Sequence, residues 1–152
     1  MNEVADTVTV RLGTFDGNTI WEESRPIRVK ANSSQAVCRW EAGQLAAAPD
    51  RYLAVTSAGG VFPFNRHLFA PIKDLRRAPS PPDVSITQVN EHELHVSLKA
   101  KEYALFVHLI VPHEATRFSD NYFDLQPGDH QTIVVTNQAI ALSPNDVQVA
   151  WR

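Results

Sequence analysis

Cysteine is almost absent from this chain of 152 residues, since Cys38 is the only one. A lone cysteine cannot form an intramolecular disulfide. Its neighbours Val37 and Trp40 indicate a partly apolar setting, so we interpret Cys38 as an ordinary thiol in or near a strand, neither a nucleophile nor a metal ligand. This cysteine usage suits a reducing compartment and favours a cytoplasmic location.

Long hydrophobic runs are also missing. No apolar stretch approaches the ~20 residues that a membrane-spanning helix needs, and residues 1–6 show neither the basic region nor the hydrophobic core of a signal peptide. We therefore expect a soluble chain. It begins abruptly in a strand-like segment, residues 7–12, as an excised fragment would.

Positive charge is scarce in the second half. Residues 1–78 carry ten Lys or Arg and eight Asp or Glu, whereas residues 79–152 carry four and nine, within a net charge of −3 for the whole chain. Binding to a phosphate backbone depends on its neutralisation by Lys and Arg. The acidic second half makes nucleic acid a poor partner.

Helix-forming sequence is confined to residues 41–48, which end at Pro49 and are too short for a stable helix. We predict one or two helical turns there. The first half otherwise favours strands, because residues 7–12 alternate polar and apolar and Asp16-Gly17-Asn18 supplies a turn into a hairpin. Further strands are expected at residues 19–21, 26–30, 35–40 and 52–56.

Three prolines between residues 76 and 83 remove backbone donors and fix φ, which favours an extended linker. We place a boundary there, between domains at residues 1–78 and 79–152. About six short strands follow, at the spacing typical of an immunoglobulin-like sandwich. No strand–helix–strand alternation occurs, so we predict an all-β fold with two β-sandwich domains in tandem. The later strands are expected at residues 84–87, 93–98, 104–111, 122–125, 132–136 and 147–151.

Residues 116–129 form the densest run of specific chemistry in the chain. Residues 122–125 look like a short strand and Pro127-Gly128-Asp129 like a reversal, so we predict a hairpin with residues 132–136. Ser119 or Asp120 should hold backbone donors at the strand entry, and Tyr122 or Phe123 should pack into the core. Two flanking carboxylates, Asp124 and Asp129, are expected to be solvated turn residues.

The segment RFSDNYFDLQPGD at residues 117–129, with EYALFVHLIV at residues 102–111, resembles the C-terminal immunoglobulin-like domain of β-mannosidases and related glycoside hydrolase family 2 enzymes. Residues 12–23, 29–37 and 66–76 resemble the preceding β-sandwich of the same enzymes. The resemblance implies a first domain that lacks its opening strand at the N-terminus and a complete second domain.

The resemblance also implies a non-catalytic accessory region of a parent enzyme that hydrolyses terminal β-mannosides with retention. Such enzymes need two carboxylates ≈ 5–5.5 Å apart, which this family carries on a (β/α)₈ barrel of ≈ 250 residues. The barrel is too long for this chain and is the expected partner. Glu22 and Glu23 should point to opposite faces of a strand, and Glu91 and Glu93 border a turn, so we expect solvated surface and no catalytic residue.

Six histidines raise the question of a metal site. No pair has the helical i, i+4 spacing of a zinc site, and we expect His108 on the outer or interdomain face of its strand. Asp120, Asn121 and Asp124 offer too few oxygens for Ca²⁺. We expect no metal and no cofactor.

Aromatic side chains are the remaining candidates for ligand contact, because their ring faces stack on sugars. The candidates for carbohydrate or interdomain contact are Trp21, Trp40, Tyr122 and Trp151. They are scattered, so packing into the core is the competing interpretation. Trp151, next to the chain end, is placed to close the last strand onto its sheet or to dock on a neighbouring domain.

Other functions remain open. The parent could be an exo-β-glucosaminidase of the same family, or the region could be a module that binds oligosaccharide through aromatic rings. A structural or adhesive pair unrelated to glycosidases is a third possibility. The expected loss of an opening strand would leave an unpaired sheet edge in the first half, where a second copy could associate.

Overall fold

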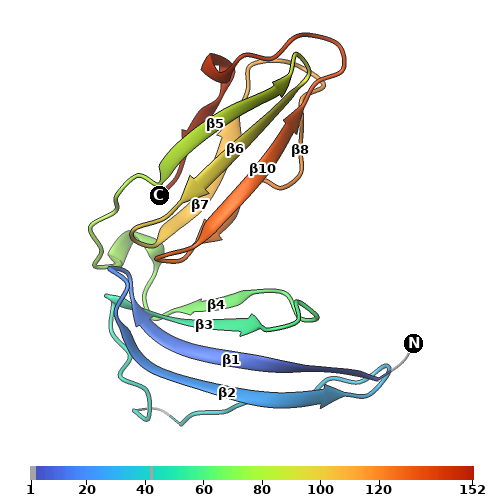
Figure 1. The fold of residues 1–152 in the computed structure, drawn as a ribbon. Helices are drawn as coiled ribbons and strands as arrows, with labels where there is room; N and C mark the ends of the chain where they lie inside the picture. The colour runs from blue at the N-terminus through green and yellow to red at the C-terminus, as the bar shows by residue number, and fades with distance from the viewer. Residues whose placement is uncertain (1–2, 42) are drawn as a thin grey trace. The chain divides into compact units, whose positions relative to one another are not determined.

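The computed structural model describes residues 3–41 and 43–152. In this part of the chain the regular elements are strands and two short 3₁₀ turns, η1 (Ile72–Asp74) and η2 (Pro144–Asp146), as Figure 1 shows. The prediction of an all-β fold is confirmed. Contacts divide the chain into two compact units, unit 1 (Met1–Arg77) and unit 2 (Ala78–Arg152).

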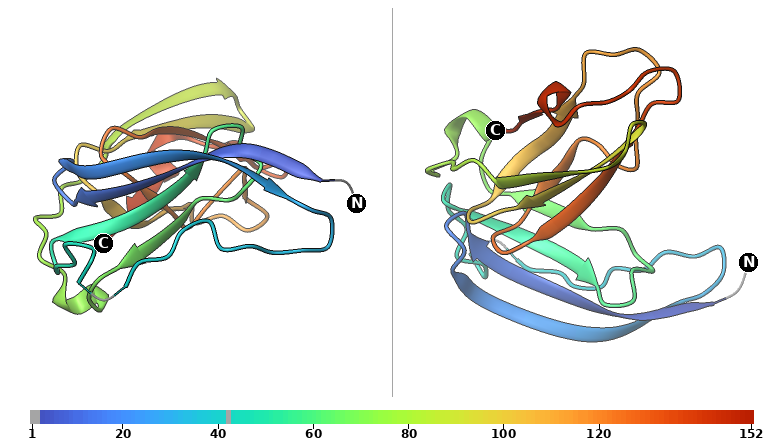
Figure 2. Two further views of the ribbon diagram at one scale, coloured as in Figure 1. Left: turned by 90° about the horizontal axis from the view of Figure 1, so that it is seen from below. Right: turned by 45° about the horizontal axis from the view of Figure 1, so that its top comes forward.

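Unit 1 contains a four-stranded antiparallel sheet with the order β2-β1-β3-β4. Its strands, coloured blue to green in Figures 1 and 2, are β1 (Val4–Thr14), β2 (Thr19–Val29), β3 (Arg51–Ser57) and β4 (Asn65–Leu68). The predicted first hairpin is confirmed: the Thr14 amide donates to the Asn18 carbonyl at 2.9 Å. Gly17 takes φ +98°, which the turn requires and a glycine adopts without strain.

Two strands of unit 1 differ from expectation. Residues 19–21 and 26–30, predicted as separate strands, are parts of the single strand β2, except that Lys30 lies beyond its end. Pro26 is accommodated because β2 is an edge strand, where a missing N–H breaks no ladder. β4 was not predicted, because its sequence Asn-Arg-His-Leu has no apolar alternation and its pairing comes from β3.

The predicted strand at residues 35–40 is wrong, since this segment is irregular. Its apolar side chains, with those of residues 21, 27, 45, 55, 62 and 69, pack against the core of unit 1, which is formed by Val8, Val10, Leu12 and Leu53. Alternation of polar and apolar residues indicates that one side of a segment is buried. An irregular segment that lies over a sheet can show the same alternation without being a strand. The predicted helical turns at residues 41–48 are also irregular where described; residue 42 lies outside the described residues.

The expected loss of an opening strand concerns the start of the chain, and residues 1 and 2 lie outside the described residues. In the described part, β1 is paired on both sides, with β2 and with β3. The structure therefore leaves that expectation untested.

A carboxylate ties β1 to the turn that follows β3. Asp6 accepts hydrogen bonds from the Thr7 amide at 2.7 Å, from the Gly59 amide at 3.0 Å and from the Ser57 hydroxyl. The Ser57 hydrogen bond, assisted by backbone amides, lowers the pKa of the Asp6 carboxyl from its ordinary value, against a smaller opposing effect of burial.

Acid is therefore expected to weaken unit 1 through Asp6. Because the folded pKa lies below the unfolded one, the stabilisation is present above about pH 4 and is lost as the pH falls through the folded pKa. Replacing Asp6 with asparagine should lower the melting temperature at pH 7 and flatten its decline below about pH 4. Differential scanning calorimetry from pH 7 to pH 2.5 measures this, with Ser57→Ala as a partial variant. Parallel wild-type and Asp6→Asn profiles would contradict the assignment.

Unit 2 is a sandwich of two sheets. One has the order β5-β6-β10-β8, and the other has the order β11-β7-β9. The strands, green to red in Figures 1 and 2, are β5 (Asp83–Asn90), β6 (Glu93–Lys99), β7 (Ala104–Ile110), β8 (Arg117–Phe118), β9 (Phe123–Leu125), β10 (His130–Thr136) and β11 (Gln148–Ala150).

The core of unit 2 lies between these sheets and follows from strict alternation. In β6, residues 94, 96 and 98 are fully buried while residues 93, 95 and 97 are not, as a strand with one buried face requires. The opposite layer comes from β7 and β9. The buried cluster is formed by Leu94, Val96, Leu98, Ala100, Ala104, Val107, Leu109, Leu125, Ile133, Val135 and Leu142.

The predicted hairpin between residues 122–125 and 132–136 is wrong. β9 pairs with β7, whereas β10 pairs with β6 and β8, so the turn between β9 and β10 crosses from one sheet to the other. A period of two shows which face of a strand is buried but not which strand is its partner. β8, a pair of residues, is too short to give a pattern of its own.

The reversal at residues 126–129 is present nevertheless. The Asp129 amide donates to the Gln126 carbonyl and the Gly128 amide to the Ala100 carbonyl, each at 2.9 Å. Gly128 takes φ +88°, in the region that side chains disfavour. An added Cβ would meet no atom within 4 Å, so the requirement for glycine is one of backbone conformation and not of space.

Replacing Gly128 with valine is expected to destabilise unit 2 by about 2 kcal/mol, because a β-branched residue is strained at positive φ. Gly128→Asn is the matched control, since asparagine adopts this conformation more readily, and it should cost roughly half as much. Urea denaturation followed by circular dichroism measures both. Equal effects of valine and asparagine would show that backbone strain is not the cause.

Candidate functional site

Beside β7, the side chain of Asn121 makes the hydrogen bonds that the backbone of a neighbouring strand would otherwise make. Its Oδ1 accepts from the Leu109 amide at 2.8 Å, and its Nδ2 donates to the Leu109 carbonyl at 3.1 Å. The same Oδ1 also accepts from the Tyr122 amide at 3.2 Å. Asn121 thus holds the entry to β9 against β7 where the backbone pairing is irregular.

Neighbouring carboxylates are also structural. Asp124 accepts from the Phe106 amide at 3.0 Å and from the Tyr103 hydroxyl at 3.1 Å, and Asp129 accepts from the Gln126 amide at 2.9 Å. The prediction of an ordinary solvated turn residue is therefore wrong for Asp124, because its partners lie in another part of the chain, where local sequence cannot reveal them. Asp129 accepts from an amide of its own turn, as a turn carboxylate is expected to do.

The entry to β9 otherwise behaves as expected. Ser119 Oγ accepts from the Val134 amide at 2.9 Å, and Asp120 accepts from the Asn121 amide at 2.8 Å. The second oxygen of Asp120 accepts from Gln131 at 3.1 Å. These contacts give Ser119 and Asp120 a structural role at the entry to β9.

Two bulky residues are strained at this irregularity. Phe106 in β7 has φ +52° and Tyr122 has φ +66°, which is rare for aromatic residues. Each amide is fixed by a side-chain acceptor, Asp124 for Phe106 and Asn121 for Tyr122. Such strain persists only where the surrounding structure enforces it.

The result of this arrangement is an exposed aromatic ring. Phe123 packs against the core of unit 2, but Tyr122 is 70% exposed. The Tyr122 ring stacks on His108, with 4.7 Å between ring centroids and 11° between planes. His108 lies on the outer face of β7, as the alternation predicted, and its Nδ1 lies 2.9 Å from the Phe106 carbonyl oxygen.

The tryptophans lie in different settings. Trp151 packs against the core of unit 2, and the next residue pairs with Leu105 through backbone hydrogen bonds of 2.7 and 2.8 Å, so the chain end closes onto β7. Trp21 and Trp40 meet edge to face, with ring centroids 5.9 Å apart, beside the core of unit 1.

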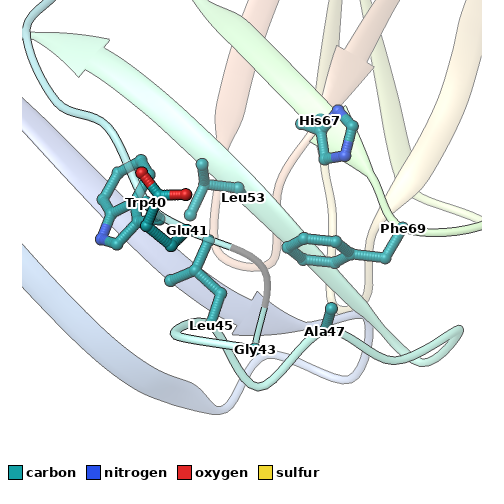
Figure 3. A pocket seen from close by; sticks show the side chains of 8 residues that line it. All are labelled: Trp40, Glu41, Gly43, Leu45, Ala47, Leu53, His67 and Phe69. Atoms are coloured by element: carbon teal, nitrogen blue, oxygen red, sulfur yellow. The ribbon is translucent and has the colours of Figure 1, made fainter.

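An apolar pocket of about 350 Å³ opens beside Trp40. Figure 3 shows Trp40 and Leu45 along one side, Phe69 and His67 along the other, and Leu53 rising from β3. The lining is completed by Glu41, Gly43 and Ala47. A second cavity of about 280 Å³ lies among Leu12, Ile20, Trp21, Trp40, Gln44, Leu45 and Ala46, so Trp40 borders both.

Sequence reasoning identified Trp40 but not the other pocket residues. Glu41, His67 and Phe69 come from an irregular segment and from the region of β4, neither of which has a pattern that predicts where its side chains gather. Glu41 is the one carboxylate among the described residues that line this pocket. A retaining glycosidase needs a pair.

The carboxylate pairs considered from the sequence are engaged elsewhere. Glu22 forms an ion pair with Arg11 at 2.6 Å and Glu23 one with Arg25. The Arg25 hydrogen bond lowers the pKa of Glu23, which remains a carboxylate. Glu93 contacts His95 at 2.8 Å, on the outer face of β6.

Cys38 and the histidines are the remaining candidates for chemistry. Among the described residues, no group of three His, Cys, Asp or Glu side chains is placed to hold a metal ion. Burial raises the pKa of the Cys38 thiol, against a weaker opposing effect of Arg25, which makes it a poor nucleophile. No helix in the part of the chain that the structure describes has the length and apolar character to span a membrane.

Comparison with protein families gives two matches that together cover most of the chain. Residues 1–74 match the Mannosidase Ig/CBM-like domain, and residues 80–150 match the Ig-fold domain of mannosidases. No curated protein matches the chain.

Solved structures with a similar fold include a β-D-mannosidase from Dictyoglomus thermophilum, which is 16% identical with a TM-score of 0.79. The exo-chitosanase CsxA of Amycolatopsis orientalis is 14% identical with a TM-score of 0.59. Each alignment covers 99% of this chain, but only 19% of the mannosidase and 23% of the exo-chitosanase. The chain thus spans about a fifth of the length of these enzymes.

These likenesses concern the fold, and the family matches give the assignment. The expected resemblance to the C-terminal region of β-mannosidase-like enzymes is confirmed in both halves. The chain belongs to the Ig-like domains of mannosidase-type glycoside hydrolases, with a Mannosidase Ig/CBM-like domain followed by a mannosidase Ig-fold domain.

Proposed function

We propose that this chain is the non-catalytic accessory region of a larger glycoside hydrolase. The proposal is supported by the match of both units to mannosidase-type domains. The chain also spans only about a fifth of the length of the enzymes with a similar fold. The two domains would brace a catalytic barrel, which is the missing partner. The carboxylates paired in the sequence fit this role, because Glu22 and Glu23 form ion pairs with arginines and Glu93 contacts His95.

The parent polypeptide provides the test. An immunoblot of the source cells, with an antibody against this 16.9 kDa chain, is expected to detect a protein roughly four to five times larger. A band at the mass of the chain alone would contradict the proposal. A large band that lacks glycosidase activity after immunoprecipitation would also contradict it.

For the parent reaction we propose retaining hydrolysis of terminal β-mannosides. It is supported by the mannosidase type of both domains and by the greater likeness to the β-mannosidase fold than to the exo-chitosanase fold. An exo-β-glucosaminidase is the alternative parent. The immunoprecipitated protein distinguishes them by its preference for p-nitrophenyl β-mannoside or p-nitrophenyl β-glucosaminide.

The pocket beside Trp40 supports a second function for unit 1, as a module that binds oligosaccharide. It offers aromatic and aliphatic walls with a carboxylate and an imidazole at its rim, a combination found in small-ligand sites. Calorimetry with mannohexaose tests this idea. Binding that Trp40→Ala abolishes would support it, and binding that Trp40→Ala leaves unchanged would exclude the pocket.

Self-association, the other partner predicted from the sequence, would use the outer edge of β2. Within the described residues β2 pairs with β1 alone. Pro26 and the charges of Glu22, Glu23 and Arg25 lie along this strand, and prolines and charges are the features that protect edges from pairing. Analytical ultracentrifugation across a concentration series decides, because association at this edge requires a dimer that grows with concentration.

A further inference from the structure

We propose that the Tyr122–His108 pair is a carbohydrate-binding platform, to which a hexopyranose ring stacks on the free face of Tyr122. The proposal rests on the proposed function, because the sugar would be an oligosaccharide of the kind that the parent enzyme processes. It concerns unit 2 and is separate from the pocket beside Trp40.

The ring of Tyr122 is unusually exposed. At 70%, Tyr122 has the highest relative exposure among the large hydrophobic side chains in the described part of the chain. A tyrosine in a sandwich ordinarily contributes its ring to the core, because the ring buries a large apolar area. The neighbouring Phe123 does so, which leaves Tyr122 on the outside of β9.

The backbone at Tyr122 is strained where it places the ring outside. Tyr122 has φ +66°, and Asn121 fixes its amide while also clamping both backbone groups of Leu109. A glycine or asparagine would adopt this backbone more readily. Enforced strain of this kind is concentrated at functional sites.

The Tyr122 ring is also held in one orientation. One face of Tyr122 lies flat on His108, with only 11° between the two rings, and His108 is itself fixed at the Phe106 carbonyl. An aromatic side chain held in one orientation loses little entropy on binding. Its opposite face then offers a flat surface for the axial C–H groups that line one side of a pyranose ring.

The chemistry therefore selects a hexopyranose with an unobstructed C–H face. β-Linked mannose and β-linked glucosamine both have one, so the platform alone does not separate them. Asp120, exposed close by in sequence, adds negative charge that would favour the amino sugar. Comparing mannohexaose with the hexamer of glucosamine distinguishes the two sources.

The test is titration of the ¹⁵N-labelled chain with each hexasaccharide, followed by NMR. We expect shifts centred on the amides of residues 108 and 121–123. Tyr122→Asn removes the ring but keeps a residue that tolerates positive φ, so it should fold and should lose affinity by roughly tenfold or more. Tyr122→Trp should retain binding. Phe64→Asn is the control, because Phe64 is an exposed aromatic residue of unit 1.

Several outcomes would overturn the platform. One is the absence of shifts with either sugar, and another is shifts confined to residues around Trp40. Shifts at Tyr122 that depend on protein concentration and not on sugar would indicate a protein interface instead. The proposed function fails separately, through the mass of the parent polypeptide, and a chain that is not accessory could still bind sugar at Tyr122.

Discussion

Replacing Asn137 with alanine is expected to lower the free energy of unfolding of unit 2 by about 3 kcal/mol. The side chain is 1% exposed and joins two loops. Its Nδ2 donates to the Glu114 carbonyl at 2.9 Å and to Thr116 Oγ1 at 3.1 Å, while its Oδ1 accepts from the Ala139 amide at 2.9 Å. Truncation leaves several of these buried groups without their partner, and each such loss costs about 1–3 kcal/mol.

Urea denaturation at pH 7, followed by circular dichroism, measures the effect. Asn145→Ala is the matched control, because Asn145 is exposed and its hydrogen bond to Ser143 Oγ comes from the backbone amide, which alanine keeps. The control should stay within about 0.5 kcal/mol of wild type. A loss below about 1 kcal/mol in Asn137→Ala would show that water replaces the side chain and that the loops are not held by it.

Replacing Asn121 with alanine is expected to cost unit 2 about 2–3 kcal/mol. Leu109 is 3% exposed, and its amide and carbonyl both depend on this side chain on the β9 side of β7. Without the Asn121 side chain, the Tyr122 amide loses its acceptor. We therefore expect the loss of stability to be accompanied by weaker stacking of Tyr122 on His108.

Asn121→Asp separates the effects of the two hydrogen bonds to Leu109, one from its amide and one to its carbonyl. A carboxylate still accepts from the Leu109 amide but cannot donate to its carbonyl, and it adds a negative charge next to Asp120 in the sequence. This variant should be at least as unstable as Asn121→Ala at pH 7. The His108 and Tyr122 ring resonances in NMR report the geometry of the stacked pair. Ring resonances unchanged in both variants would mean that the strain at Tyr122 is enforced by other contacts.

The fold class could be predicted from the sequence because the main strands bury one face. β1, β6, β7 and β10 each show the alternation that places every second residue in a core. The same reasoning failed at residues 35–40, where an irregular segment buries its apolar side chains over a sheet. It also could not find the partner of β9, because the pairing of β9 with β7, which lies well before it in the chain, leaves no local signal.

The candidate sites were predictable only in part. The sequence indicated that residues 116–129 are rich in capping side chains, but it could not show that Asn121 and Asp124 bond to residues of β7. That pairing exists because β9 joins β7 with an irregular register. The exposure of Tyr122 follows from the same irregularity, so it too depends on long-range contacts. Chain length, by contrast, already excluded a barrel.

Hydrolysis by the isolated chain is the most direct test of its accessory role. The purified chain at high concentration is incubated with p-nitrophenyl β-mannoside and with p-nitrophenyl β-glucosaminide, beside a Glu41→Gln variant that removes the one carboxylate of the Trp40 pocket lining. The accessory assignment predicts p-nitrophenol release equal to that of buffer alone for both proteins. Release that rises in proportion to the concentration of the chain, and falls in Glu41→Gln, would contradict it.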